Sequence, residues 1–450
     1  MKPEQIRRYA AAPVPRYTSY PTAPHFHDGI GPDVYRTWLS EIAPGSRLSL
    51  YVHVPFCDTL CWFCGCHTKI TRKYKPIAAY LETLIAEARH VAAALPAGVE
   101  VGQIHWGGGS PTILEADDVK RLASELAAAL PQTAAPEFAV EVDPRGLSSD
   151  QIAAFAASGL TRVSVGVQDF DPAVQKAINR VQSFEETASV IAQFRAAGVK
   201  SVNIDAIYGL PGQYEAQLRR TLDQILTLAP DRISLFGYAH VPWMKKHQGM
   251  IDDATLPDAV ARHAHAELAA RMFVEAGYVR IGLDHFARGS DSMAVALREG
   301  RLTRNFQGYT VDPSDALIGL GASSIGRLPQ GYVQNLTPIG GYTAAIARDG
   351  LATARGYAMS DEDRVRGRLI ERLMCTFDFD PDDLEGAGDA LSGELIDCAR
   401  QIVGEDRDGL VAPRGDGFAL TEEGQPFVRL FAARFDAHLA AGRGRHSVAV

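Results

Sequence analysis

The 450-residue sequence has little cysteine, no long apolar run and no excess of basic charge. No stretch approaches the ~18 apolar residues that a membrane-spanning helix needs, and the N-terminus has no apolar core typical of a signal peptide. The formal net charge of −9 argues against nucleic acid or an anionic membrane as the main partner, although local basic clusters could bind an anionic small molecule. We therefore expect a cytoplasmic protein without a membrane span.

Only six cysteines occur, and four lie within ten residues, at Cys57, Cys61, Cys64 and Cys66. So many thiols in one short segment indicate a metal site. The C-x3-C-x2-C spacing favours an iron–sulfur cluster, which is held by thiolates from tightly spaced loops. Two alternatives stay open: a zinc knuckle, which usually needs a second knuckle or paired histidines, and a disulfide, which is rare in the cytosol. Outside this loop, Cys375 and Cys398 are expected to be buried small apolar residues.

The rest of the chain alternates strand-like and helix-like segments. We expect strands at 48–54, 101–106, 137–142, 161–167, 200–205 and 232–237, each followed by helices. This alternation predicts parallel βα units, and in βα barrels the chemistry lies at the C-terminal ends of the strands. The fold class is therefore α/β, a partial TIM-like barrel, with 278–283 and 317–326 as candidates for extra strands.

Three regions are expected along the chain. Residues 1–45 form an N-terminal arm and lead-in, 46–355 the barrel with its extension, and 356–450 a mostly helical, winged-helix-like domain. In that last region we predict helices at 361–376 and 391–403, a β-wing over 408–421 and a final helix from 422. Its acidic content argues against DNA binding and favours a lid on the barrel.

The cysteine loop, which directly follows a strand and has Phe63 before its third Cys, resembles that of the radical S-adenosylmethionine (SAM) enzymes. The added cysteine in Cys64-Gly65-Cys66 and the stretch from Pro15 to Thr22 are similar to the oxygen-independent coproporphyrinogen III oxidases (dehydrogenases) of haem biosynthesis. The resemblance implies a (βα)6 barrel and a [4Fe-4S] cluster with one iron open to SAM. It makes Cys57, Cys61 and Cys64 the ligands and leaves Cys66 outside the set.

The resemblance also implies the residues that bind SAM. Taken singly, each has an ordinary structural explanation: a tight turn for the glycines, a salt bridge for Glu141, core packing for Tyr51 and Phe63. Two further positions match segments that line a deeper part of the pocket, where a second SAM has been associated with the family: Gln307 and Ile325. The contacts implied for the first part of the pocket are Tyr51, Phe63, Gly108, Gly109, Ser110, Glu141, Gln168, Arg180, Asp205 and Ala239.

The implied reaction is oxidative decarboxylation of two propionates of coproporphyrinogen III to vinyl groups, giving protoporphyrinogen IX. A radical derived from SAM would take hydrogen from the β-carbon of a propionate, followed by loss of CO2 and one electron. An electron donor such as flavodoxin or ferredoxin and an unidentified acceptor are implied, and we expect a monomer. Cationic side chains must meet the propionates. We hypothesise that Arg16 is one of them, the other candidates being Lys69, Arg72, Arg288 and Arg304.

Two other functions are weighed against this one. A haem-chaperone-type protein of the same fold would deliver a ligand rather than oxidise it, but such relatives generally lack the fourth loop cysteine and the Arg16–Pro21 arm. A zinc-stabilised interaction protein would be colourless, whereas an iron–sulfur cluster absorbs visible light. The remaining histidines show no metal-ligand spacing and are expected to be hydrogen-bonding core or pocket residues.

Overall fold

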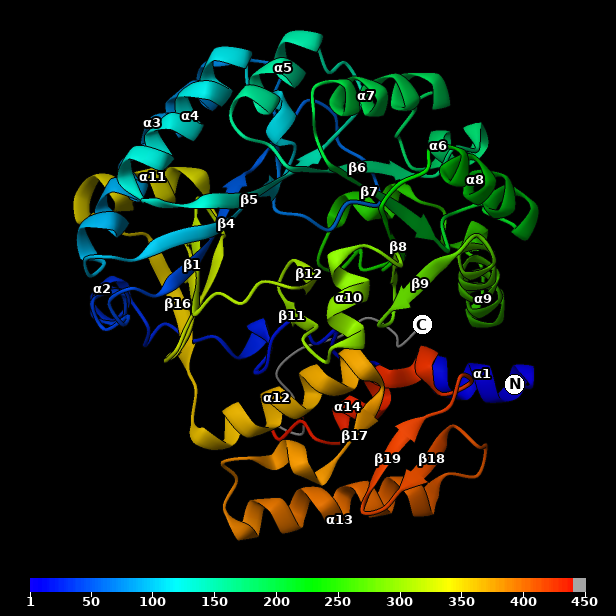
Figure 1. Ribbon diagram of the computed structural model, residues 1–450. Helices are drawn as coiled ribbons and strands as arrows, with labels where there is room; N and C mark the ends of the chain where they lie inside the picture. Colours follow the sequence, from blue (N-terminus) through cyan, green and yellow to red (C-terminus); the bar gives the residue numbers. More distant parts are fainter. Residues whose placement is uncertain (440–450) are drawn as a thin grey trace.

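The computed structural model describes residues 1–439 and is built around one curved sheet of twelve strands (Figure 1). The strand order is β16-β15-β14-β13-β1-β4-β5-β6-β7-β8-β10-β9. Six central strands run parallel in chain order: β1 (Arg47–Val54), β4 (Glu100–Gly108), β5 (Gln132–Val142), β6 (Arg162–Gln168), β7 (Ser201–Tyr208) and β8 (Arg232–Gly237). The two end strands do not pair with each other, so the sheet is a partial barrel, as predicted.

Helices cover the convex face of this sheet and leave its concave face as the lumen (Figure 1). Strand β6 shows how the sequence builds this arrangement. Val163, Val165 and Val167 are completely buried, and because side chains alternate across a strand, Ser164 and Gln168 face the lumen. The covering helices are α3 (Lys75–Ala94), α4 (Ala116–Ala129), α5 (Ser149–Ala157), α6 (Pro172–Ala177), α7 (Phe184–Ala196), α8 (Glu215–Thr227), α9 (Ala259–Glu275) and α11 (Ile339–Asp349).

Additional strands extend both ends of the sheet. On one side β13 (Ala316–Leu320) pairs parallel with β1, followed by the antiparallel β14 (Ile325–Leu328), β15 (Gly331–Asn335) and β16 (Thr353–Ala358). On the other side, β10 (His285–Arg288) and β9 (Tyr278–Ile281) are antiparallel. The region 317–326, a candidate for extra strands, contains most of β13 and the start of β14. The chain reverses there, with Gly321 at φ +99° and Ser323 at φ +65°.

Several short elements complete the barrel. The hairpin of β11 (Thr303–Asn305) and β12 (Gly308–Thr310) and the helix α10 (Ser292–Arg298) follow the last strands on the β9 side. Strands β2 (Phe56–Cys57) and β3 (Lys69–Ile70) flank the cysteine loop. Short 3-10 helices lie at Ala23–His25, Pro111–Ile113, Lys246–Met250, Asp253–Thr255, Pro381–Leu384 and Gln425–Phe427. No helix within residues 1–439 is long and apolar enough to cross a membrane.

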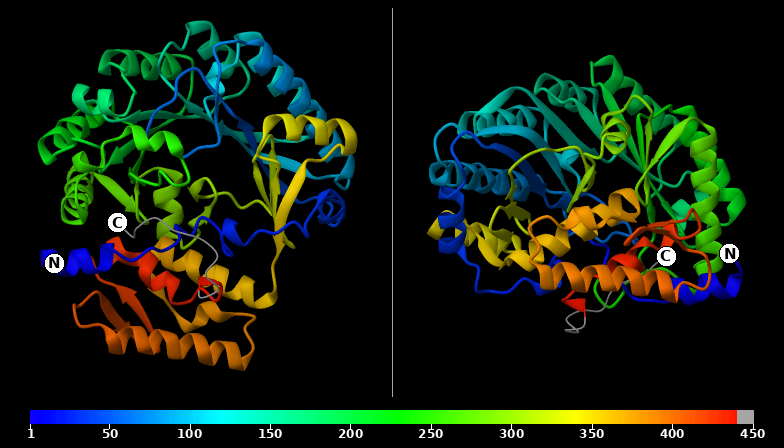
Figure 2. Two further views of the ribbon diagram at one scale, coloured as in Figure 1. Left: turned by 180° about the vertical axis from the view of Figure 1, so that it is seen from behind. Right: turned by 60° about the horizontal axis from the view of Figure 1, so that its bottom comes forward.

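The C-terminal elements form their own apolar cluster, to which Tyr17 and Tyr20 of the N-terminal arm contribute. Figure 2 shows the blue N-terminal segment running between the barrel and the orange and red C-terminal elements. Helices α1 (Pro3–Ala10) and α2 (Pro32–Ser40) flank the arm and were not predicted. The C-terminal elements are α12 (Asp361–Thr376), β17 (Asp378–Phe379), α13 (Asp389–Glu405), β18 (Val411–Arg414), β19 (Gly417–Leu420) and α14 (Val428–Ala433).

These elements follow the predicted order of helix, helix, β-wing and helix, with the last helix beginning at Val428 rather than at 422. Residues 440–450 of the predicted C-terminal domain lie outside the described residues. The division of the chain into three domains stays a prediction. Of the two cysteines expected to be buried, Cys375 is, whereas Cys398 is only half-buried and its Sγ lies 3.5 Å from the carbonyl oxygen of Arg434.

Candidate active site

The cysteine loop leaves β1 at the rim where the parallel strands end. All six cysteines lie in the described residues and are free thiols, so the disulfide alternative was wrong. Burial, and next the charges of Cys64 and Cys61, raise the pKa of Cys57 to about 12. The thiols of Cys61 and Cys64 lie close enough to Cys57 for their charges to act on it. A metal cluster bound to the thiolates would neutralise their negative charges and so relieve the repulsion between them.

Two guanidinium groups reach the thiol of Cys61. Nη1 of Arg180 and Nη2 of Arg145 each lie 3.6 Å from its Sγ. Both arginines also bind the carboxylate of Asp143, at 3.1 and 2.6 Å. Positive charge beside a sulfur favours the thiolate, which is the form that ligates metal. Further hydrogen bonds run from Arg180 to the Gly166 carbonyl and the Gln182 side chain, so its fork is largely engaged within the protein.

The segment that follows β8 holds the main chain of the cysteine loop. His247 Nε2 donates a hydrogen bond to the carbonyl of Cys64 at 2.8 Å. Gln248 Nε2 donates to the carbonyl of Phe63 at 2.9 Å, and Lys245 Nζ donates to that of Cys66 at 2.9 Å. The sequence analysis missed these residues. Their only sequence signal is a polar run in the insert between a strand and a helix.

The residues of this loop fit an iron–sulfur cluster. Soft thiolates suit such a cluster, and hydrogen bonds to its sulfurs tune it; the amide of Cys66 donates to the Cys64 Sγ at 3.4 Å. Within residues 1–439, no three or more His, Cys, Asp or Glu side chains are grouped so that they could hold a metal ion. Thiolates that each bind a different iron of a cluster need not converge on one point.

The glycine turn after β4 is fixed by a carboxylate from β5. Gly108 has φ +107°, and its amide donates to Glu141 Oε2 at 3.0 Å. His105 Nε2 donates to the other carboxylate oxygen at 3.3 Å. Burial alone would raise the pKa of Glu141, but these two donors bring it below its ordinary value. Ser110 is buried, and its hydroxyl is 2.7 Å from that of Thr112.

Polar side chains also occur at the end of β6 and within β7, which continues to Tyr208 beyond the predicted end at 205. Asp205 accepts hydrogen bonds from Ser164 Oγ and Asn203 Nδ2, both at 2.8 Å, and burial raises its pKa. Gln168 has φ +66°, a conformation that costs a non-glycine residue energy and that clusters at functional sites. Its side chain makes no hydrogen bond to another residue among 1–439. These two groups offer donors and acceptors to a ligand.

The two predicted aromatic contacts, Tyr51 and Phe63, have different neighbours. The Tyr51 hydroxyl is 3.0 Å from His53 Nδ1, and its ring stacks on His105 with centroids 5.9 Å apart. Phe63 packs against the apolar cluster around Val174. Ala239 follows β8 and is half-buried.

The remaining predicted positions are farther along the chain. Gln307 is exposed at the tip of the β11–β12 hairpin, and Ile325 begins β14. Arg16 of the N-terminal arm donates from Nη2 to the Gly237 carbonyl, at the end of β8, over 3.3 Å. Thus the arm reaches the rim of the barrel.

One residue that the sequence analysis named as a candidate to bind the propionates, Arg288, does not lie at the rim. Arg288 Nε donates to the carbonyl of Pro230 at 3.0 Å, which precedes β8 and lies at the opposite end of the barrel. The reason is that β10 runs antiparallel to β8, so its last residue returns to the N-terminal edge. Lys69 and Arg72 lie beside the cysteine loop and make no side-chain hydrogen bond to the rest of residues 1–439.

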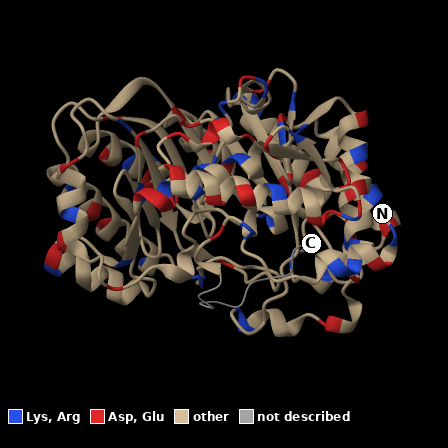
Figure 3. Ribbon diagram, turned by 90° about the horizontal axis from the view of Figure 1, so that it is seen from below, with Lys and Arg blue, Asp and Glu red and all other residues tan. Residues whose placement is uncertain are grey.

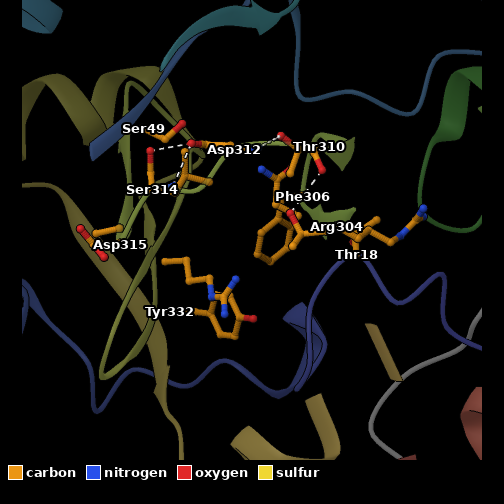
Figure 4. A pocket seen from close by; sticks show the side chains of 14 residues that line it. Thr18, Ser49, Arg304, Phe306, Thr310, Asp312, Ser314, Asp315 and Tyr332 are labelled. Carbon is orange, nitrogen blue, oxygen red and sulfur yellow. Dashed lines mark hydrogen bonds between the residues drawn. The ribbon is translucent and has the colours of Figure 1, made fainter. Parts of the chain in front are cut away.

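A pocket lies near the N-terminal half of β1, away from the cysteine loop (Figure 4). Ser49 lines it together with the segment before β13, where Ser314 Oγ donates to Asp312 Oδ1 at 2.5 Å. Thr18 of the arm and Arg304 of β11 close its other side. The pocket therefore joins the arm to the hairpin inside the barrel, and none of the residues predicted to bind SAM lines it.

Comparison with known proteins identifies this site. The family model "Radical SAM superfamily" matches residues 51–225, which include the cysteine loop, Glu141 and Asp205. An oxygen-independent coproporphyrinogen III oxidase from Bradyrhizobium diazoefficiens is 49% identical over 450 residues, covering 100% of both chains. One from Paracoccus denitrificans is 44% identical, covering 98% of this chain and 97% of its own.

A solved structure supports the same family assignment as these sequence comparisons. The coproporphyrinogen III oxidase from Escherichia coli, described as a radical SAM enzyme, superposes with a TM-score of 0.89 at 38% identity, covering 94% of this chain and 97% of its own. The site is thus that of a radical SAM enzyme. The chain belongs to the family of oxygen-independent coproporphyrinogen III oxidases. Its cofactors are a [4Fe-4S] cluster and SAM. The iron–sulfur prediction for the cysteine loop is thus confirmed, and the zinc alternative was wrong.

Proposed function

We propose that this enzyme converts coproporphyrinogen III to protoporphyrinogen IX by oxidative decarboxylation of two propionate side chains in haem biosynthesis. The observation that carries the proposal is identity over the whole chain with an oxidase of that name, including the Arg16–Pro21 arm, which haem-chaperone-type proteins of the same fold generally lack. The cysteine loop retains the fourth cysteine, Cys66.

Within this proposal, Cys57, Cys61 and Cys64 hold the cluster. When bound, the cluster supplies the electron that cleaves SAM and so provides a carbon radical for hydrogen abstraction at a propionate β-carbon. Arg145 and Arg180 hold Cys61 in place through hydrogen bonds to its sulfur. Loss of CO2 and of one electron to an acceptor then leaves a vinyl group, and the cycle runs twice.

The rim residues position SAM in the same proposal. Glu141 is ionised because the Gly108 amide and His105 donate hydrogen bonds to it. Its carboxylate accepts a hydrogen bond from the amino group of the methionine part of SAM. Asp205 and Gln168 bind ribose hydroxyls, for which their acceptor oxygens are suited. Gly108 and Gly109 keep the main chain bare of side chains, so that it can approach the cofactor closely.

The N-terminal arm and the C-terminal helices exclude water from the site. A primary carbon radical abstracts hydrogen from most C–H bonds, so the reaction needs a closed site. The N-terminal arm packs with the C-terminal helices on the open side of the barrel. Arg16 of the arm binds the carbonyl of Gly237 at the end of β8 and so lies at the rim.

Finer parts of the proposal rest on the resemblance alone. They are an electron donor such as flavodoxin or ferredoxin, an unidentified electron acceptor, a cytoplasmic monomer, and a second SAM beside Gln307 and Ile325. The resemblance alone also supports contacts with SAM for five further residues: Tyr51, Phe63, Ser110, Arg180 and Ala239.

An anaerobic turnover assay tests the function. Reconstituted enzyme receives dithionite, SAM and coproporphyrinogen III, and the oxidised porphyrins are separated by chromatography. We expect protoporphyrin with release of CO2 and 5′-deoxyadenosine, and none of these from Cys61→Ala. Cleavage of SAM with recovery of intact coproporphyrinogen III would contradict the proposal and favour a chaperone role.

A further inference from the structure

Two arginines and one carboxylate lie beside the sulfur of Cys61. Arg145 follows β5, and Arg180 lies in the turn after α6. Nη2 of Arg145 donates to Asp143 Oδ2 at 2.6 Å, and Nη1 of Arg180 donates to the same oxygen at 3.1 Å. These are also the two nitrogens that lie 3.6 Å from the Cys61 Sγ. One carboxylate oxygen therefore holds the two guanidinium groups at the spacing at which both reach one sulfur.

The other donors of the two arginines fix this arrangement. Arg145 Nε donates to Asp143 Oδ1 at 3.0 Å, so its fork binds both oxygens of the carboxylate. Arg180 donates from Nη2 to the Gly166 carbonyl at 2.5 Å and from Nε to Gln182 Oε1 at 3.1 Å. Neither guanidinium can turn away from the sulfur without breaking these hydrogen bonds.

This group of side chains carries one more positive charge than negative. Asp143 is the only carboxylate within residues 1–439 that forms an ion pair with either arginine. Elsewhere Lys and Arg are interspersed with Asp and Glu, as the view from below shows (Figure 3). The Arg180 side chain is 8% exposed and that of Arg145 is 19% exposed, so water and salt screen the extra charge only weakly. A net positive charge therefore acts on the sulfur of Cys61.

The sulfurs of the other two predicted ligands have no such charged donors. The Cys64 Sγ accepts a hydrogen bond from a neutral group, the amide of Cys66, at 3.4 Å. No side chain or amide within residues 1–439 donates a hydrogen bond to the Cys57 Sγ. The charge near an iron–sulfur cluster and the hydrogen bonds to its sulfurs both set its reduction potential. Cys61 is thus the position through which the protein acts most strongly on that potential.

We propose that Arg145, together with Arg180 and Asp143, sets the reduction potential of the [4Fe-4S] cluster through the sulfur of Cys61. One-electron reduction by a low-potential donor adds one negative charge to the cluster and breaks no bond. The net positive charge beside Cys61 therefore stabilises the reduced form more than the oxidised form. Arg145 acts through Cys61, as a positioning residue. The inference rests on ligation by Cys61, which is part of the proposed function, and is independent of the substrate that the radical attacks.

The test measures the midpoint potential of the cluster in reconstituted enzyme without substrate. Redox dyes and dithionite set the potential anaerobically, and visible absorbance and electron paramagnetic resonance report the reduced fraction. Arg145→Gln removes a positive charge and should lower the equilibrium constant for reduction about tenfold, a fall of about 59 mV for one electron. Arg145→Lys keeps the charge without the fork and should recover part of this shift. Asp143→Asn removes the negative charge and should raise the potential.

Arg162→Gln is the matched control. The Arg162 side chain is 17% exposed and pairs with Glu137, but it begins β6 at the opposite end of the barrel. Its loss should leave the midpoint potential unchanged. The midpoint is read only from clusters that are present, so partial loss of iron does not alter it. Where Arg145→Gln holds too little cluster to titrate, the rise expected in Asp143→Asn carries the comparison.

The direction of the shifts decides the outcome. Opposite shifts in Arg145→Gln and Asp143→Asn support the inference. Equal potentials in these variants and the wild type overturn it, and so do shifts in the same direction, which would indicate a loosened cysteine loop. A product assay separates the inference from the proposed function. Opposite shifts without vinyl product leave the inference standing while the function fails, whereas equal potentials with vinyl product overturn the inference alone.

Discussion

Arg180 donates a hydrogen bond from Nη1 to the sulfur of Cys61 at 3.6 Å, although 119 residues separate the two in sequence. The contact joins the cysteine loop after β1 to the turn after α6. The same guanidinium binds Asp143 at the end of β5. One buried side chain thus ties the cluster loop to two other parts of the rim.

Replacing Arg180 should therefore loosen the cluster. Arg180→Gln leaves Asp143 with one arginine, and breaking a buried ion pair costs about 3–5 kcal/mol. We expect lower iron content after anaerobic desalting and a lower free energy of unfolding in denaturant. As a control, Arg220→Gln removes a pair in which the arginine is exposed, with Asp171, and should cost under about 1 kcal/mol. Equal iron content and stability in the two variants would contradict this account.

The glycine turn gives a steric prediction. A Cβ on Gly108 would lie 2.3 Å from the His53 ring, which is buried and hydrogen-bonded to Tyr51. Gly108→Ala should therefore abolish SAM binding, measured by equilibrium dialysis, and lower the thermal midpoint. Gly146→Ala is the matched control: φ is also positive, but nothing lies within 4 Å of the added carbon. It should show only the strain of about 1–2 kcal/mol. Normal SAM binding by Gly108→Ala would refute the steric argument.

The carboxylate beside that turn gives a binding prediction. Glu141→Gln removes the negative charge that would meet the SAM amino group, so the Kd for SAM should rise about tenfold while the visible spectrum of the cluster is kept. Glu137→Gln, in the same strand, breaks only the pair with Arg162 and should leave SAM binding unchanged. Equal SAM affinity in the two variants would remove Glu141 from the cofactor site.

The buried carboxyl of Glu87 gives a prediction about pH. It accepts hydrogen bonds from the Gly321 amide, Asn335 and Tyr342, but burial still raises its pKa from 4.5 to about 7. The folded protein therefore holds this proton more tightly than the unfolded chain. The contribution of Glu87 to stability is greatest below pH 4.5 and falls by about 3 kcal/mol as the pH rises to 7.

Glu87→Gln has no such proton, so its stability should lack this part of the pH dependence. The measurement is denaturant unfolding of both proteins at pH 5 and pH 7. The difference in unfolding free energy between wild type and variant should change by about 2 kcal/mol between the two pH values, since part of the loss already occurs below pH 5. A difference that does not change with pH would mean that Glu87 is ionised without cost in the folded state.

The sequence predicted the rim well because strand endings can be located from local patterns. Glu141, Gln168 and Asp205 come near or at the ends of alternating apolar segments, and parallel βα units bring such ends together. The cysteine loop was found from spacing alone. The turn at Gly321–Ser324 was missed because Glu87, far away in sequence, holds it.

Contacts between distant side chains could not be predicted. His247 and Gln248 bind the cysteine loop across 183 and 185 residues, and no local pattern distinguishes them from other polar loop residues. The misplacement of Arg288 has a different cause: alternation predicts a strand but not its direction.

The most direct test of the central claim follows one hydrogen atom. Coproporphyrinogen III with deuterium at the propionate β-carbons is turned over anaerobically with SAM and reductant, and the 5′-deoxyadenosine is analysed by mass spectrometry. The account predicts one deuterium in each 5′-deoxyadenosine and one CO2 released for each vinyl group formed. Unlabelled 5′-deoxyadenosine, formed while the substrate remains intact, would contradict it.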